Sequence, residues 1–200
     1  MDVTILLPAG RLPLEVMTKA GELARKNDLR IYLSTLQNLR LLDVPEDKVD
    51  EIKQELRSMG LELKGPGKFP VPKVCIGQGH CNLGRMDPEE LSGRLLGKFG
   101  DRSDVKQKLK IAVSACPLCC SGGKLTDIGI VATKNGYELY AGGKGGPNPR
   151  IGRRILKDAT EDEVLEAFEK VFDFHQKMTD KKQRMAKLVD HEDFPYPEEV

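Results

Sequence analysis

The apolar positions of the first sixty residues follow two different periods. A short run of strand formers at 2–8 precedes apolar residues at helical spacing within 12–27, and strand formers return at 29–35. A second helical pattern, 45–60, begins with proline and acidic residues and ends at glycine. Closed by a short segment at 61–64, this β-α-β-α order predicts a small layer with helices on one face of a sheet.

A segment rich in glycine and proline follows at 65–73. Such a composition cannot continue a helix or a central strand. We therefore predict two domains, residues 1–66 and residues 67–200.

Two helix starts are marked in the second domain. Asp87 is a candidate N-cap, Pro88 suits the first turn, and Glu90 would complete a capping box. Thr160 and Glu163 form the same pattern before a long helical segment.

Strand patterns lie between these helices. Along 108–115, Lys108 and Lys110 alternate with apolar residues, which predicts that both lysines share one side of a strand. Asn135 and Gly136 separate two strand-forming runs and predict a hairpin. Arg153 and Arg154 come shortly before the second capping box, so we expect a solvated helix start there.

Composition excludes several classes of function. The 32 Lys and Arg residues nearly cancel the 31 Asp and Glu residues, so no global field attracts nucleic acid or an anionic membrane. No apolar run approaches the roughly 18 residues of a membrane span, and no signal-peptide pattern opens the chain. We expect a cytoplasmic protein whose core needs no disulfides.

Five cysteines remain as candidates for chemistry. Four form two pairs, Cys75-x5-Cys81 and Cys116-x3-Cys120, and Cys119 is left over. Both pairs lie in turn-forming sequence, where backbone N–H groups can face cluster sulfurs. Four soft thiolates in such turns indicate an iron–sulfur cluster.

Three other interpretations stay open at this point. Cysteines are often simply buried. Cys116-x2-Cys119 has the spacing of a zinc knuckle, although the remote x5 pair does not. The same pair also has thioredoxin-type spacing, but glycines follow where that redox motif normally opens a helix.

The residues around the cysteines resemble a known family. "VCIGQGHCNLGRMDPEEL", "KIAVSACPLCCSGGKLTDIGIVA" and "YAGGKGGPNPRIGRRI" resemble the sirohaem and 4Fe-4S domain of the nitrite/sulfite reductase family. "LPAGRLPLEVMTKAGELA" and "STLQNLRLLDVPEDKVDEIKQELRSMGL" resemble its ferredoxin-like half-domain. The resemblance implies an α+β fold, a ferredoxin-like half-domain followed by a domain with a mixed sheet flanked by helices. The length is similar to that of the small single-repeat reductases.

The resemblance also implies cofactors and ligands. Cys75, Cys81, Cys116 and Cys120 would ligate a 4Fe-4S cluster, with Cys120 bridging to the iron of sirohaem. The implied reaction is the multi-electron reduction of sulfite or nitrite, with electrons passing from the cluster to a haem that binds the anion. The resemblance implies a ferredoxin-like electron donor. It also implies a homodimer, because two-repeat relatives have internal two-fold symmetry that a one-repeat chain would reproduce with a second copy.

Further residues match positions that contact substrate or cofactor in the family. Lys108 and Lys110 match a Lys-x-Lys pair that contacts the substrate or the cofactor, although exposed strands commonly carry lysines without a function. Gln37, Asn38 and Arg150 match cofactor-binding positions, and Arg150 follows glycines whose amides would approach a carboxylate.

Two departures from the family pattern bear on activity. Leu36 stands where reductases carry an arginine that binds the anion, and Leu118 stands where asparagine is usual. One missing charged hydrogen bond to an oxyanion costs about 1.5 to 3 kcal/mol. The sequence therefore leaves two hypotheses, a sulfite or nitrite reductase and a non-catalytic iron–sulfur electron-transfer or accessory subunit.

Overall fold

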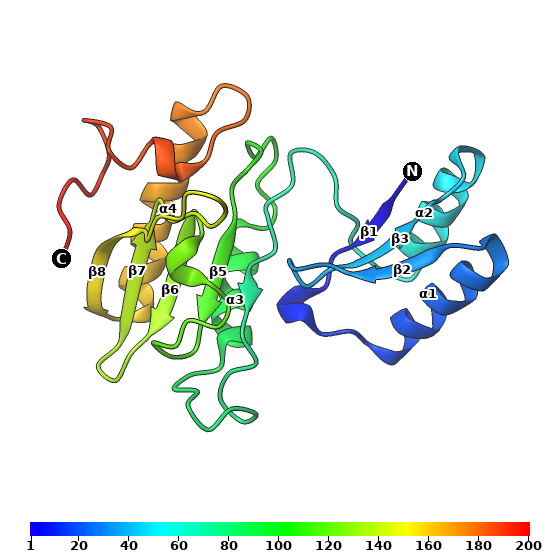
Figure 1. Cartoon of the computed structure of the whole chain (residues 1–200), viewed down its shortest axis with the longest axis horizontal. Helices are drawn as coiled ribbons and strands as arrows, with labels where there is room; N and C mark the ends of the chain where they lie inside the picture. Colours follow the sequence, from blue (N-terminus) through cyan, green and yellow to red (C-terminus); the bar gives the residue numbers. More distant parts are fainter. The chain divides into compact units, whose positions relative to one another are not determined.

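The computed structural model describes residues 1–200, which divide into two compact units, Met1–Gly65 and Pro66–Val200. Figure 1 traces both units along the chain, and each is described here by itself. None of the helices combines the length and the apolar character needed to cross a membrane.

The first unit is a three-stranded antiparallel sheet with two helices. Its strands lie in the order β1-β3-β2. The elements are β1 (Val3–Ile5), α1 (Leu14–Asn27), β2 (Arg30–Leu33), β3 (Leu39–Leu42) and α2 (Val49–Ser58), with short 3-10 helices η1 (Pro8–Gly10) and η2 (Glu46–Lys48). The predicted order of helical and extended segments is confirmed, with β3 as an additional central strand.

Both helices of the first unit cover the same face of the sheet. Ile5 and Leu39 are register partners on that face and are fully or almost fully buried. They belong to one apolar core with Leu23 of α1 and Leu56 of α2. The period-2 and helical patterns of the sequence thus meet in a single core, as the predicted layer requires.

The second unit is built on a five-stranded mixed sheet in the order β4-β5-β6-β7-β8. The strands β4, β5 and β6 are parallel to one another, and β7 is antiparallel to both of its neighbours, β6 and β8. Its elements are β4 (Lys73–Val74), α3 (Pro88–Phe99), β5 (Ile111–Ser114), η3 (Gly123–Leu125), β6 (Ile128–Ala132), β7 (Tyr137–Ala141), β8 (Arg153–Ala159), α4 (Glu161–Met178) and η4 (Met185–Lys187).

The helices α3 and α4 lie side by side on this sheet (Figure 1). Arg94 of α3 forms ion pairs with Glu161 and Asp162 of α4. Beneath these pairs, an aromatic cluster of Phe69, Phe99, Phe168 and Phe172 fills the space between the helices, with ring centroids 5.0 to 6.2 Å apart. Aromatic packing of this kind therefore fixes α3, the helix that follows the first cysteine pair.

The predicted helix starts are mostly confirmed. Thr160 and Glu163 form the full capping box at the start of α4. Asp87 caps α3 with Pro88 in the first turn, but its side chain accepts the N–H of Glu89. The expected participation of Glu90 is therefore not needed for this cap.

Two strand predictions are corrected. The strand β5 begins at Ile111, so both lysines precede it. Lys108 has φ +77°, a left-handed conformation that breaks the strand-like alternation of side chains at this position. The prediction that both lysines share one side of that strand is therefore wrong. Arg153 and Arg154 open β8 instead of a helix, because their backbone pairs with Ala141 and Tyr140 of β7.

The hairpin predicted at Asn135 and Gly136 is confirmed between β6 and β7. The Thr133 N–H donates to the Gly136 carbonyl at 2.8 Å and closes the turn. Gly136 has φ +145°, and a Cβ there would lie 2.6 Å from the carbonyl oxygen of Ala159 in β8. Only glycine allows β8 to lie this close to the turn.

The segment after α4 is held by buried polar groups. Asp127 is fully buried and accepts hydrogen bonds from the Arg184 Nε, the Met185 N–H and the Lys110 N–H. His175, also fully buried, donates from Nε2 to the Gln183 carbonyl. These contacts tie the C-terminal segment to the start of β5 and β6.

We predict that His175 makes the stability of the protein depend on pH. Burial lowers the pKa of His175 below its usual value of 6.5. Since the unfolded chain then binds a proton that the folded chain does not, the contribution is present above pH 6.5 and is lost as pH falls towards the folded-state pKa. Urea unfolding below pH 6.5 should show a slope of up to about 1.4 kcal/mol per pH unit that His175→Gln removes. An unchanged slope in that variant would contradict this assignment.

Candidate iron–sulfur site

The two cysteine-bearing loops begin at the carboxyl ends of neighbouring parallel strands. Cys75 directly follows β4, and Cys116 follows β5 by two residues. Val74 and Val113 are register partners in this parallel pair. Because parallel strands end at the same edge of a sheet, the two loops start side by side.

Ala115, at the start of the second loop, binds the first loop through its backbone. Its N–H donates to the Cys75 Sγ at 3.1 Å, and its carbonyl accepts the Arg85 N–H at 2.9 Å. The Cys75 N–H donates to the Val113 carbonyl, which continues the strand pairing. The loop containing Cys75 and Cys81 therefore leaves β4 beside the end of β5 and returns to that end at Arg85.

Two close approaches keep that loop compact. A Cβ at Gly77 would lie 2.0 Å from the Pro88 ring, and a Cβ at Gly84 would lie 2.6 Å from the Gln78 nitrogen. The glycines therefore permit the loop to fold on itself and against the start of α3.

The second loop folds through successive turns. The Cys119 N–H donates to the Cys116 carbonyl, and the Gly122 N–H donates to the Cys119 carbonyl. At its end, η3 lies against β6 so closely that a Cβ at Gly129 would be 1.8 Å from the Gly123 carbonyl oxygen. The loop is thus fixed at both ends, by β5 and by β6.

The thiols differ in exposure. Cys116 is buried, Cys75, Cys81 and Cys119 are partly buried, and Cys120 is exposed. No disulfide joins any of them. In this arrangement no three His, Cys, Asp or Glu side chains form a site for a single metal ion.

The four predicted ligands nevertheless suit a cluster. A 4Fe-4S cluster is wider than one ion and takes one soft thiolate at each iron, so its ligands stand farther apart than those of a single zinc ion. The loops that carry Cys75, Cys81, Cys116 and Cys120 are pinned to one strand end by Ala115. Their role as ligands stays a prediction.

Three residues predicted to contact the substrate or the cofactor lie at the other end of the sheet. The first residue of β5, Ile111, is in register with Ile128, Ala141 and Arg153 in successive strands. Lys108, Lys110 and Arg150 precede this row, whereas Cys116 follows the last row of β5. Lys108, Lys110 and Arg150 therefore lie before the strands, at the ends opposite to those that carry the cysteine loops.

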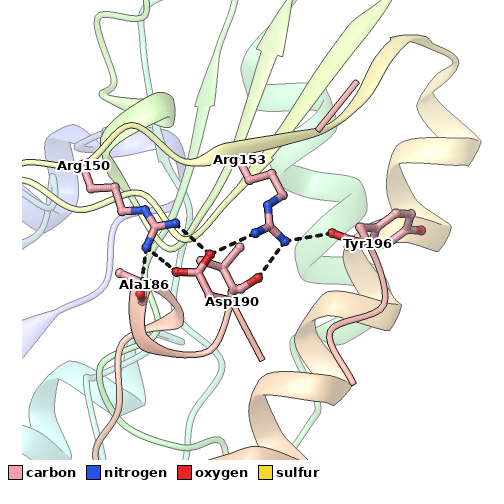
Figure 2. A network of polar contacts seen from close by, with 6 residues as sticks. Arg150, Arg153, Ala186, Asp190 and Tyr196 are labelled. Carbon is pink, nitrogen blue, oxygen red and sulfur yellow. Dashed lines mark hydrogen bonds and ion pairs between the residues drawn. The ribbon is translucent and has the colours of Figure 1, made fainter. Parts of the chain in front are cut away.

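Arg150 is already paired within the chain (Figure 2). Its guanidinium forms two hydrogen bonds with the Asp190 carboxylate, at 2.8 and 3.0 Å, and Arg153 contacts the same carboxylate at 2.9 Å. Arg150 thereby holds the pKa of Asp190 below its usual value. Two guanidinium groups thus contact one carboxylate and stabilise its ionised form.

Gln37 and Asn38 belong to the first unit. Asn38 is buried, and its Oδ1 accepts the Leu7 N–H at 3.1 Å. Gln37 has φ +61° in the turn that the Ser34 carbonyl closes. The side chain of Asn38 therefore shapes this turn, and a cofactor contact by either residue stays a prediction.

Sequence reasoning did not identify the polar groups behind the second loop. Ser114 and Ser121 are buried, with Oγ atoms 2.5 Å apart, and the Lys124 N–H donates to the Cys119 Sγ. A signal existed for Ser121, since it lies between the cysteines and the glycines of the turn.

Comparison with known proteins identifies the family. A sequence model of the nitrite and sulphite reductase 4Fe-4S domain matches residues 70–194, and a model of the nitrite/sulfite reductase ferredoxin-like half domain matches residues 3–59. The chain belongs to the nitrite and sulphite reductase family. The resemblance drawn from the cysteine-rich motifs is confirmed.

Curated relatives include both kinds of reductase. The assimilatory-type sulfite reductase of Nitratidesulfovibrio vulgaris is 28% identical over 186 residues, which are 92% of this chain and 84% of the relative. The NAD(P)H nitrite reductase of Bacillus subtilis is 34% identical over 130 residues, 65% of this chain but only 16% of the relative. The chain thus spans most of the first relative and a small part of the second.

Solved structures share the fold. The Mycobacterium tuberculosis NirA protein matches with a TM-score of 0.73 and 21% identity over 98% of this chain and 39% of its own. Dissimilatory sulfite reductase I (DsrI) matches with a TM-score of 0.79 and 13% identity over 96% of this chain and 66% of its own. These likenesses confirm the α+β fold, a ferredoxin-like half domain followed by a 4Fe-4S domain with a mixed sheet.

We predict that the contact of η3 with β6 is essential for the shape of the second loop. In Gly129→Ala, the added methyl group meets the Gly123 carbonyl, so the free energy of unfolding should fall by at least the roughly 1 to 3 kcal/mol typical of overpacking. Gly97→Ala is a matched control, since it lies exposed in α3 with no atom within 4 Å of the new Cβ. The control should be neutral or up to about 1 kcal/mol more stable. Equal stability of both variants in urea unfolding would refute the contact.

Proposed function

We propose that this member of the nitrite and sulphite reductase family is a sulfite or nitrite reductase that uses a 4Fe-4S cluster coupled to sirohaem. Cys75, Cys81, Cys116 and Cys120 would hold the cluster, and Cys120 is the residue that would couple it to sirohaem. When bound, these cofactors would supply electrons one at a time for the reduction of an oxyanion.

One observation carries this proposal. The two cysteine pairs come from loops that start at adjacent parallel strand ends and share the backbone of Ala115 as an anchor. A site of four soft donors from two such loops matches the donor set of an iron–sulfur cluster. The matched 4Fe-4S domain spans all four cysteines.

The rest of the chain supports the site by orientation and charge. The Ala115 N–H donates to the Cys75 Sγ, and backbone donors of this kind favour the anionic sulfurs of a cluster. In the proposal, Lys108 and Lys110 supply positive charge to the substrate, and Gln37, Asn38 and Arg150 contact the carboxylates of sirohaem.

A second function is favoured by one residue. Leu36 replaces the arginine expected for anion binding. A protein that binds the cluster but lacks a complete anion site would act as an electron-transfer or accessory subunit. Turnover distinguishes this function from the first.

Cluster binding has a direct test. After anaerobic reconstitution with iron and sulfide, we expect about four iron and four sulfide per chain and a broad visible absorption. Replacing one cysteine of either loop, in Cys75→Ser or in Cys116→Ser, should remove most of this iron, because one iron of the cluster then lacks its thiolate and the cluster is no longer fully held. The exposed neighbour Leu118→Ala is the matched control and should keep it. A chain that takes up one zinc and no iron would disprove the proposal.

Catalysis is tested on protein loaded with both cofactors. With reduced viologen as donor, the reductase proposal predicts oxidation of viologen that depends on sulfite or nitrite. Leu36→Arg should raise turnover, by about tenfold or more if it restores a charged hydrogen bond to the anion. A fully loaded protein that is inactive with both anions, with and without this substitution, would favour the electron-transfer function.

A homodimer with a ferredoxin-like electron donor completes the proposal. The edge strand β2 of the first unit leaves Ile31, Tyr32 and Leu33 exposed, and apolar edge strands favour association. Light scattering during gel filtration should give twice the chain mass of 22.2 kDa. A monomer at all concentrations would contradict the dimer without bearing on cluster binding.

A further inference from the structure

The fifth cysteine, Cys119, faces the inside of its loop. Its Sγ accepts the Lys124 N–H at 3.2 Å and the Ser114 hydroxyl at 3.6 Å. The Ser114 Oγ also contacts the buried Ser121 Oγ at 2.5 Å. The thiol therefore contacts the end of β5 and the start of η3 at the same time.

The backbone of Cys119 has an uncommon conformation. Its φ of +57° lies in the left-handed region, which residues with a side chain seldom adopt. Such a conformation persists only where surrounding contacts impose it. The Cys119 N–H and carbonyl each close a turn, towards Cys116 and Gly122 respectively.

The neighbours of Cys119 have different surroundings. Leu118 is 66% exposed and Cys120 is exposed, whereas Cys119 is partly buried against the two serines. The Cys119 Sγ is the acceptor of the Lys124 N–H, so removal of the sulfur leaves that amide without this acceptor. The Lys124 side chain is fixed separately, over the Tyr140 ring.

We infer that Cys119 is a positioning residue and not a ligand of the cluster. Its sulfur holds the loop where the chain passes from Cys116 to η3. The left-handed conformation of Cys119 makes its side chain point in a different direction from that of Cys120. Cys116 and Cys120 are thereby presented to the cluster while Cys119 stays bound to Ser114 and Lys124. The consequence for the cluster rests on the proposed function, but the effect on the loop does not.

The effect on the loop is measured in cluster-free, reduced protein. Amide hydrogen exchange followed by NMR should show the Lys124 N–H about fivefold less protected in Cys119→Ala, the effect expected for one hydrogen bond. Cys119→Ser keeps an acceptor and should restore part of the protection. Leu118→Ala, the exposed neighbour, should leave it unchanged. Equal protection in wild type and Cys119→Ala would overturn the inference.

The effect on the cluster is measured in reconstituted protein. Residues that orient metal ligands typically change metal affinity by 10- to 100-fold, so a chelator should remove iron about tenfold faster from Cys119→Ala than from wild type. Cys119→Ser should restore slow loss and the wild-type electron paramagnetic resonance signal. If Cys119→Ser instead fails to assemble a cluster, as Cys116→Ser should, Cys119 is a ligand and the inference is wrong.

These two measurements separate the inference from the proposed function. If wild-type protein takes up no iron, the proposed function fails, and the exchange of the Lys124 amide still decides whether Cys119 holds the loop. If wild-type protein assembles the cluster and Cys119→Ala loses it no faster, the proposed function stands and the positioning role is refuted.

Discussion

The parallel pairing of β4 with β5 is the constraint on which the candidate site depends. The strand β4 has only two residues, so its place is set by the hydrogen bonds that follow it along β5. The last of these contacts uses the thiol of Cys75 as acceptor for the Ala115 N–H. A predicted cluster ligand thus takes part in the strand pairing that places the two loops together.

Two further contacts support this strand edge. The helix α3 follows the first cysteine loop directly and is fixed by the aromatic cluster it shares with α4. Elsewhere in the unit, the close contact of Gly123 with Gly129 fixes the second loop. Cluster ligands that are held before the metal arrives need little reorganisation to bind it, which is the physical value of such a scaffold.

The sequence predicts some parts of this molecule better than others, for physical reasons. Local signals were sufficient for the α4 capping box, for the hairpin at Gly136 and for the apolar faces of α1 and α2, because each depends on neighbouring residues. The start of β8 at Arg153 and the interruption before β5 at Lys108 depend on strand pairing between distant segments, and local pattern predicted them wrongly. The cysteine spacing predicted two loops, but only the strand order shows that they share an edge. The ion pair of Arg150 with Asp190 could not be predicted from the local sequence, because Asp190 lies forty residues away in the chain.

The cluster is the common element of both functions considered for this chain, and the anion site is where they differ. Leu36 concerns the anion, whereas the cysteine loops concern only the cluster. X-ray absorption at the iron edge of anaerobically reconstituted protein therefore tests the central claim most directly. The account predicts a first shell made only of sulfur together with iron–iron scattering, as in a 4Fe-4S cluster. Iron bound singly, with nitrogen or oxygen neighbours and no iron–iron scattering, would contradict it.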